Sequence, residues 1–211
     1  FRRVLFRSEL EHIEAHARKL GVKTHTTINA VKDYYDRIIK YLVFGNVLKN
    51  NTYALSVSAE RLSQALHIAE HAKALQADAV AHGSTGAGND QVRFDMVFHI
   101  MIPGVEIITP IRDLKLSREQ EIKYLQEKGV EMNAEKALYS INKGLWGTSV
   151  GGKETLSSKG MLPESAWPTQ VTKQDAEEVA LTFEKGELIA TFSPSTSPLS
   201  DDIKKLIEIG R

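Results

Sequence analysis

The strongest constraint on the fold is an alternation of helix-like and strand-like segments through residues 8–128. Apolar residues recur every three or four positions between Ser8 and Leu20, and Ser8 with Glu11 matches a helix-capping box. Short segments rich in β-branched residues separate this stretch from later helical ones. Because helices that alternate with strands pack on both faces of a mostly parallel sheet, we expect an α/β fold.

The expected elements follow one another in a regular order. Helices are expected at about 8–20, 30–43, 59–75, 89–102 and 117–128, and strands at 22–28, 77–81 and 105–109. After about Gly129 the long helical periodicity stops and glycine, serine and proline become frequent, which predicts a second, more irregular domain. Two strand-like segments there, 179–183 and 188–192, predict a hairpin with a positive φ at Gly186.

Composition narrows the classes of function. Lys plus Arg number 27, as do Asp plus Glu, so no net charge attracts the chain to nucleic acid or to an anionic membrane. There is no cysteine, which excludes disulfides, thiolate nucleophiles and cysteine metal sites and favours a cytoplasmic location. No apolar run approaches the roughly 18 residues of a membrane span. Small polar ligands are therefore the expected partners, with no nucleic acid and no membrane.

We expect that neither end of the sequence is the end of a complete native protein. Phe1 to Ser8 mixes apolar and basic side chains without the pattern of a signal peptide, so we expect residues 1–8 to be a non-native lead. A helix-like stretch at 201–209 is followed at once by Gly210 and Arg211. We therefore expect a fragment, with part of one α/β domain over residues 9–130 and part of another domain over 131–211.

A glycine-rich segment, residues 81–88, lies between an expected strand and an expected helix, where open α/β sheets form their ligand sites. Three glycines in six residues, Gly83, Gly86 and Gly88, let a ligand approach the backbone closely. Exposed amides in such a turn suit a phosphate or a nucleotide edge. The glycine spacing matches neither the dinucleotide fingerprint nor a Walker loop.

Three polar residues follow these glycines at the first turn of the expected helix. Asn89 lies four residues before Arg93, and Asp90 three before it, so the side chains can converge. A carboxylate, an amide and a guanidinium together complement an amino-acid zwitterion. A simpler interpretation stays open, in which Asn89 caps the helix and Asp90 pairs with Arg93 on the surface.

Histidines and tryptophans give weaker indications of a binding site. His67 and His71 have ligand spacing on the expected helix 59–75, but that helix is so apolar that we expect no metal site. Trp146 and Trp167 are expected to pack or to anchor loops. No arrangement of side chains indicates a catalytic triad, so no catalytic residue is assigned.

The run Gly-Asn-Asp-Gln-Val-Arg-Phe at residues 88–94, preceded by His-Gly and Thr-Gly, closely resembles the signature of argininosuccinate synthases. Segments 116–122, 139–149 and 183–186 resemble the same family in the same order, and the resemblance covers about residues 9–192. It departs at Ala87, where many relatives have lysine, and at 59–62, where Ala-Arg-Pro is common. These departures indicate a divergent branch.

The resemblance implies a fold and a reaction. The implied fold is adenine nucleotide alpha hydrolase-like, of the ATP pyrophosphatase type, over residues 9–130, followed by the start of an α+β synthetase domain over 131–211. The implied reaction is the ATP-dependent ligation of citrulline and aspartate to argininosuccinate, with AMP and pyrophosphate released and Mg²⁺ accompanying ATP. It belongs to arginine biosynthesis and the urea cycle, and the family is cytoplasmic and homotetrameric.

Binding roles carry over to the positions that match. The resemblance implies that Gly83 contacts ATP and that Thr85, Asn89 and Asp90 bind aspartate. Citrulline binding is implied for six residues, which are Tyr53, Ser58, Asn89, Arg93, Ser140 and Ser149. The family's Ser-Gly-Gly-x-Asp-Ser/Thr pyrophosphate loop has no match in the chain, so activity is expected in the complete parent and not in this fragment.

Two alternatives stay open. Another ATP pyrophosphatase, such as a tRNA-thiolating or amidating enzyme, would share the α/β part. A neutral chain without cysteine gives no support to RNA binding or sulfur transfer, however. The second alternative is a non-catalytic amino-acid-binding fragment.

Overall fold

The computed structural model describes residues 7–86, 88–130, 139–168, 170, 175–176, 178 and 180–192. The chain divides into two compact units, the first made of residues 1–34 and 58–137 and the second of 35–57 and 138–211. The second unit thus takes in residues 35–57 as well as the C-terminal part, and the domain boundary expected at residue 130 stays a prediction.

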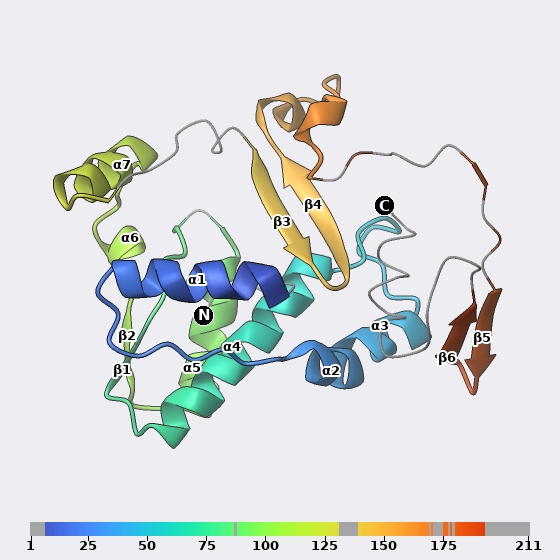
Figure 1. The fold of residues 1–211 in the computed structure, drawn as a ribbon, viewed down its shortest axis with the longest axis horizontal. Coiled ribbons are helices and arrows are strands. Elements are labelled where there is room, and N and C mark those ends of the chain that lie inside the picture. The colour runs from blue at the N-terminus through green and yellow to red at the C-terminus, as the bar shows by residue number, and fades with distance from the viewer. Residues whose placement is uncertain are drawn as a thin grey trace. The chain divides into compact units, whose positions relative to one another are not determined.

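Two short parallel strands and the helices near them form the first unit (Figure 1). Strand β1 (Ala79–Ala81) pairs in parallel with β2 (Glu106–Ile108), with Val80 opposite Ile107. The helices are α1 (Arg7–Lys19), α2 (Val31–Tyr34), α4 (Ser56–Ala74), α5 (Asp90–Met101), α6 (Pro110–Asp113) and α7 (Arg118–Glu127). Parallel pairing together with helices is the α/β arrangement that the alternating pattern predicted.

Small side chains on α4 and aromatic ones on α5 make the core of this unit. Ala65 and Ala69 are completely buried, so the backbone of α4 can approach its neighbours closely. From α5, the rings of Phe94 and Phe98 lie 5.9 Å apart between centroids. The full cluster is Ala65, Ala69, Ala72, Val80, Phe94, Val97, Phe98 and Ile102. Because it joins β1 to α5, this core fixes both ends of the glycine-rich loop that connects them.

The helices expected at 8–20, 59–75, 89–102 and 117–128 are confirmed, whereas the strand expected at 22–28 is wrong. Residues 22–28 form no strand, and no neighbouring strand pairs with them in the described part of the chain. The helix expected at 30–43 exists as three consecutive helical segments, α2, the π-helical η1 (Tyr35–Ile39) and α3 (Lys40–Phe44). Helix α6 was not expected.

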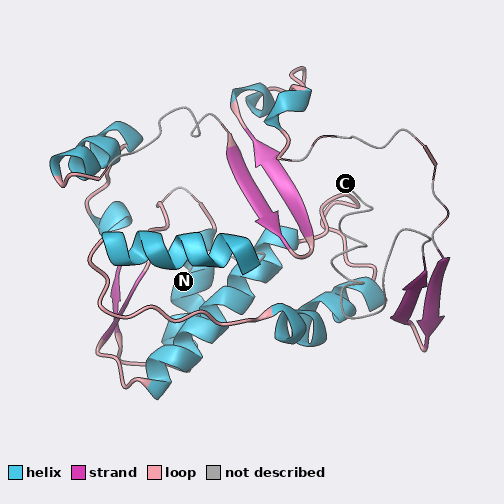
Figure 2. Cartoon of the chain, viewed as in Figure 1, coloured by secondary structure: helices cyan, strands magenta, loops and turns pink. Residues whose placement is uncertain are grey.

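Two antiparallel hairpins dominate the second unit (Figure 2). Strand β3 (Ser140–Gly144) pairs with β4 (Gly147–Gly151), and β5 (Ala180–Glu184) pairs with β6 (Glu187–Phe192). Two 3-10 helices, η3 (Lys153–Leu156) and η4 (Glu164–Ala166), follow β4. The β5–β6 hairpin is confirmed, with a φ of 85° at Gly186, whereas β3–β4 lies where only irregular structure was expected.

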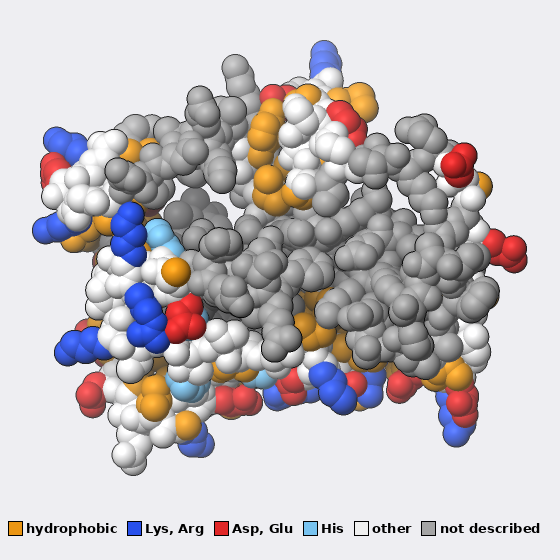
Figure 3. All heavy atoms as spheres, in the orientation of Figure 1, with side chains coloured by type: hydrophobic (Ala, Val, Ile, Leu, Met, Phe, Trp, Pro, Cys, Tyr) orange, Lys and Arg blue, Asp and Glu red, His pale blue; other side chains and the backbone are white. Residues whose placement is uncertain are grey.

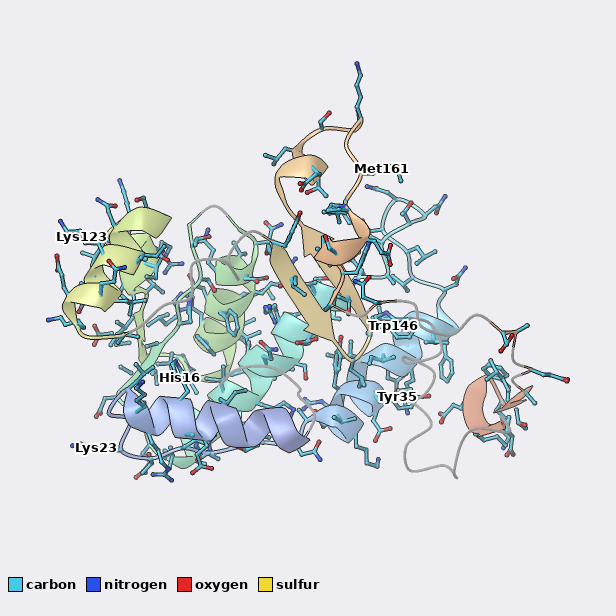
Figure 4. The ribbon with its side chains drawn as sticks, turned by 45° about the horizontal axis from the view of Figure 1, so that its top comes forward. His16, Lys23, Tyr35, Lys123, Trp146 and Met161 are labelled. Atoms are coloured by element: carbon cyan, nitrogen blue, oxygen red, sulfur yellow. The ribbon has the colours of Figure 1, made fainter. Side chains whose placement is uncertain are left out.

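Trp146 anchors the turn between β3 and β4, where Figure 4 labels it. Its indole Nε1 donates a hydrogen bond of 2.9 Å to the Ala54 carbonyl oxygen. The anchoring role expected of this tryptophan is thereby confirmed. Trp167 is 41% exposed, and the role expected of it stays a prediction.

Charged side chains of both signs are interspersed on the described part of the face drawn in Figure 3. Among the helices described, none is both long enough and apolar enough to cross a membrane.

Candidate functional site

The glycine-rich loop leaves the sheet at the carboxyl end of β1. The His82 amide donates to the Ile108 carbonyl oxygen at 3.1 Å, which extends the parallel pairing one residue beyond β1. The chain then runs without helix or strand to Asp90, the first residue of α5, and Ala87 lies outside the described residues. The loop therefore occupies the edge where open α/β sheets bind their ligands, as the sequence predicted.

The backbone of this loop is accessible. Gly83, Thr85, Gly86 and Gly88 are all exposed. A Cβ atom added at Gly83 would meet no atom within 4 Å, so the space beside that backbone is open. A ligand can consequently approach the main chain at Gly83 directly.

Asp90 lies at the centre of a charged cluster. Arg93 Nη1 donates to Asp90 Oδ1 at 2.7 Å, and Arg61 Nε donates to Asp90 Oδ2 at 3.1 Å. All three side chains are partly buried. The structure therefore brings Asp90 and Arg93 together as expected and adds a second guanidinium from α4.

The position of Asn89 tests the simpler interpretation, in which this residue caps the helix and Asp90 pairs with Arg93 on the surface. It occupies the position before α5, but its side chain makes no capping hydrogen bond, and the residue is exposed. The side-chain cap of that alternative is therefore wrong, while its pair between Asp90 and Arg93 is present. Because Arg61 from another helix joins this pair, the cluster is more than a local surface contact.

Arg61 is the cluster residue that sequence reasoning missed. Its Nη1 donates to Gln64 Oε1 at 3.2 Å, and Gln64 Nε2 donates to Glu60 Oε1 at 2.9 Å. Glu60 and Gln64 are buried, so Arg61 is held at the core surface. It lies 29 residues before Asp90 in the sequence, and helical spacing cannot reveal a contact at that distance.

Asp95, on the second turn of α5, is held in its ionised form. Its Oδ1 lies 3.0 Å from His82 Nε2, and its Oδ2 accepts a hydrogen bond of 2.5 Å from Arg112 Nη1. Burial by itself would raise the pKa of Asp95, but the hydrogen bonds from His82 and Arg112 outweigh it and hold the pKa below its ordinary value of 3.8. The same ion pair raises the pKa of Arg112.

His82 and His67 both have carboxylate neighbours. The His82 ring stacks on Phe94, with 5.3 Å between ring centroids. His67 lies 3.2 Å from Asp33 and 3.6 Å from Glu70. Within the described ranges, no group of three or more His, Asp or Glu side chains could hold a metal ion.

The remaining expected citrulline contacts divide between the two units. Ser58 belongs to the first unit, while Tyr53, Ser140 and Ser149 belong to the second. The Tyr53 hydroxyl accepts a hydrogen bond of 3.1 Å from the Val57 amide in the first turn of α4.

Ser140 and Ser149 lie on the same face of the β3–β4 hairpin. Ser149 pairs with Asn142, which is two residues after Ser140 on β3. Directly paired residues share a face, and so do residues two apart along a strand. The hairpin register therefore presents both serine hydroxyls on one side.

The known proteins that this chain resembles share one description, argininosuccinate synthase. Residues 6–131 match the family model described as "Arginosuccinate synthase N-terminal HUP domain". The argininosuccinate synthase of Methanocaldococcus jannaschii is 39% identical over 208 residues, which cover 95% of this chain and 51% of the relative. That of Methanococcus maripaludis is 40% identical over 211 residues, with the same coverage. That of Sulfolobus acidocaldarius is 38% identical over 181 residues, which cover 85% of this chain and 46% of the relative.

The chain spans about half the length of the curated relatives it matches. These relatives do not favour the alternative of a tRNA-thiolating or amidating enzyme. The family match covers the parallel sheet, the glycine-rich loop and the Asp90 cluster, which all lie within residues 6–131. The chain belongs to the argininosuccinate synthase family.

Proposed function

We propose that the protein containing this chain is an enzyme that joins citrulline to aspartate and consumes ATP. The reaction would serve arginine biosynthesis or the urea cycle, and the enzyme would be a cytoplasmic homotetramer. The observation that carries the proposal is the Asp90 cluster beside an exposed glycine-rich loop, at the carboxyl end of a parallel strand. Membership of the family supports the choice of citrulline and aspartate as substrates.

In the proposed site, the loop backbone at Gly83 contacts ATP, and Thr85, Asn89 and Asp90 bind aspartate. Each Asp90 carboxylate oxygen receives one guanidinium hydrogen bond and keeps a further lone pair for an ammonium group. The exposed amide of Asn89 has both a donor and an acceptor, so it can contact aspartate and citrulline at once.

Arg93 is proposed to bind the citrulline carboxylate. A guanidinium has five N–H donors in a planar fork, so Arg93 can retain Asp90 and still bind a substrate carboxylate. The other proposed citrulline contacts are Tyr53, Ser58, Asn89, Ser140 and Ser149. The common face of Ser140 and Ser149 supports their acting together.

The proposed chemistry has two steps. The ureido oxygen of citrulline attacks the α-phosphorus of ATP and expels pyrophosphate. The amino group of aspartate then attacks the activated carbon and displaces AMP. Neither step needs a protein nucleophile, so the side chains bind the reactants, align them and exclude water.

Mg²⁺ is proposed to arrive with ATP. The exposed backbone at Gly83 can contact ATP, whereas the described residues offer no group of three or more His, Asp or Glu side chains for a resident metal. Mg²⁺ keeps several waters and is commonly held by substrate phosphates, where it neutralises their charge.

Turnover is proposed for the complete gene product and not for the 211-residue chain alone. The test incubates each with ATP, Mg²⁺, citrulline and labelled aspartate. The complete gene product is expected to form argininosuccinate, AMP and pyrophosphate in equal amounts, and only when both amino acids are present. Product formed with ammonia or tRNA in place of aspartate would contradict the proposal, and product formed by the 211-residue chain would contradict its second part.

A further inference from the structure

Four side chains connect two positions in the middle of the glycine-rich loop, Ser84 and Gly86, through hydrogen bonds. We call them the loop brace, and they are His82, Gln91, Asp95 and Arg112. At one end, the Ser84 amide donates to His82 Nδ1 at 3.3 Å. At the other end, Gln91 Nε2 donates to the Gly86 carbonyl oxygen at 2.6 Å. No binding role has been assigned above to any of the four.

The middle of the brace is the Asp95–Arg112 ion pair. Asp95 Oδ1 contacts His82 Nε2 at 3.0 Å, and Asp95 Oδ2 accepts from Arg112 Nη1 at 2.5 Å. The same Arg112 nitrogen donates to Gln91 Oε1 at 3.2 Å. A continuous path therefore runs from Ser84 through the ion pair to Gly86.

Every link of this path has a defined donor and acceptor. The Ser84 amide can only donate, so His82 Nδ1 must accept and its proton must lie on Nε2, which faces the Asp95 carboxylate. Arg112 can only donate, so Gln91 turns its oxygen toward Arg112 and its amino group toward Gly86. Changing one member therefore leaves a neighbour without its partner.

The brace is anchored in the first unit on both sides of the loop. The His82 side chain is 7% exposed, and Asp95 and Arg112 are 24% and 29% exposed. Asp95 belongs to α5, which is part of the core, and Arg112 belongs to α6. The proline at the first position of α6 and a 2.7 Å hydrogen bond from the Thr109 hydroxyl to Asp113 fix that short helix.

Without such anchoring, a loop with three glycines in six residues samples many backbone conformations. Ordering each residue costs about 1–2 kcal/mol of conformational entropy. Hydrogen bonds to Ser84 and Gly86 restrict the loop between them before any ligand binds. A loop restricted in this way binds its ligand at a smaller entropic cost.

We propose that Asp95, Arg112 and Gln91 are positioning residues that hold the loop from Ser84 to Gly86, next to Gly83, in the conformation that contacts ATP. The identity of this ligand rests on the proposed function, whereas the restriction of the loop does not. These residues act through the loop backbone and touch no reacting atom.

The first test measures amide hydrogen exchange in the complete gene product without ligand. Asp95→Asn is expected to speed exchange at Ser84 at least about tenfold, because the loss of a charged hydrogen bond is worth about 1.5–3 kcal/mol. Gln91→Ala is expected to speed exchange near Gly86. The matched control is Glu106→Gln, the same change of carboxylate to amide at an exposed position of β2, which should leave the loop unchanged.

The second test compares steady-state constants. Asp95→Asn and Arg112→Gln are each expected to raise the KM for ATP about tenfold while changing kcat less than threefold. Because both break the same path, the double variant should be little worse than either single variant. Arg112→Lys keeps the charge but loses the planar fork, so it should restore the contact to Asp95 better than the contact to Gln91.

The outcomes separate this proposal from the proposed function. Faster loop exchange in a folded Asp95→Asn variant supports the brace even if no argininosuccinate forms. Unchanged exchange at Ser84 and Gly86 in folded variants would overturn it, even if the wild type makes argininosuccinate. If Asp95→Asn fails to fold, Gln91→Ala and Arg112→Gln are measured in its place, and unchanged exchange in both folded variants would equally overturn it.

Discussion

Asp90 receives hydrogen bonds from arginines on two helices, and this geometry determines how a substrate can approach it. Arg93 donates a hydrogen bond to one carboxylate oxygen and Arg61 donates one to the other. The orientation of the carboxylate plane is therefore fixed. The ammonium group of aspartate is proposed to bind along the remaining lone pairs, which would orient the nitrogen that attacks once it has lost a proton.

Replacing Asp90 by alanine is expected to abolish turnover without unfolding the protein. The change removes the acceptor for the substrate ammonium and leaves two guanidinium groups facing the site. Asn89→Ala is expected to have the same effect through the loss of its amide. Argininosuccinate formation and thermal unfolding are measured together, with Val92→Ala as the control because Val92 is 60% exposed on the same helix. Wild-type rates from either site variant would show that the motif has been misassigned.

Arg61→Ala is expected to raise the KM for aspartate about tenfold and to leave the KM for citrulline within about twofold. The reason is that Asp90 would lose the hydrogen bond that fixes its second oxygen, worth about 1.5–3 kcal/mol for a charged group. Lys73→Ala, at an exposed position of the same helix, is the matched control. Equal increases in both KM values would instead indicate a general distortion of the site.

The Asp95→Asn variant is also expected to change the dependence of stability on pH. Because the folded-state pKa of Asp95 is lowered, its ionised form stabilises the fold above its unfolded pKa, near 3.8, and this contribution disappears as the pH falls through the folded-state value. The difference in free energy of unfolding between wild type and Asp95→Asn should therefore be largest near neutral pH and shrink below about pH 4. Urea unfolding at pH 7, 4 and 3 measures this, and a difference that grows on acidification would contradict the assignment.

The periodicity of apolar residues predicted the long helices correctly. It failed for short elements, whose structure depends on contacts with residues distant in the sequence. Helix α4 was recognisable because its apolar residues recur over five turns. Residues 22–28 have the composition of a strand, but no strand pairs with them in the described ranges, and pairing cannot be read from composition. Helix α6 has four residues, too few for a period to show, and depends on Pro110 and Thr109.

The same distinction separates the site residues that could be predicted from those that could not. Asp90 and Arg93 share one helical turn, so their spacing was enough to bring them together, whereas Asn89 precedes that helix and is exposed. Arg61 and Arg112 reach the site from other helices, 29 residues from Asp90 and 17 from Asp95. Only the packing of α4 and α6 beside α5 reveals those contacts.

The packing of α5 in the core can be tested at Phe98, which is 1% exposed. Phe98→Ala should lower the free energy of unfolding by about 3–5 kcal/mol, because it removes a large buried side chain and leaves a cavity. Ile100→Ala on the same helix should change it by less than about 0.5 kcal/mol, since Ile100 is 70% exposed. Urea unfolding compares the two, and similar effects at both positions would contradict the described orientation of α5.

At the scale of the whole molecule, the chain covers one loop and one hairpin that are proposed to serve the same reaction. The glycine-rich loop and the Asp90 cluster belong to the first unit, and the two serines of β3 and β4 belong to the second. Since the chain spans about half the length of its curated relatives, the complete gene product is the form in which turnover must be measured.

The fate of the ureido oxygen of citrulline tests whether the proposed ligation takes place. The complete gene product is supplied with ATP, Mg²⁺, aspartate and citrulline labelled with ¹⁸O at the ureido position, and the AMP is analysed by mass spectrometry. If that oxygen attacks the α-phosphorus and aspartate then displaces AMP, one ¹⁸O atom appears in each AMP and none in pyrophosphate. AMP without ¹⁸O, or label in pyrophosphate, would contradict the account.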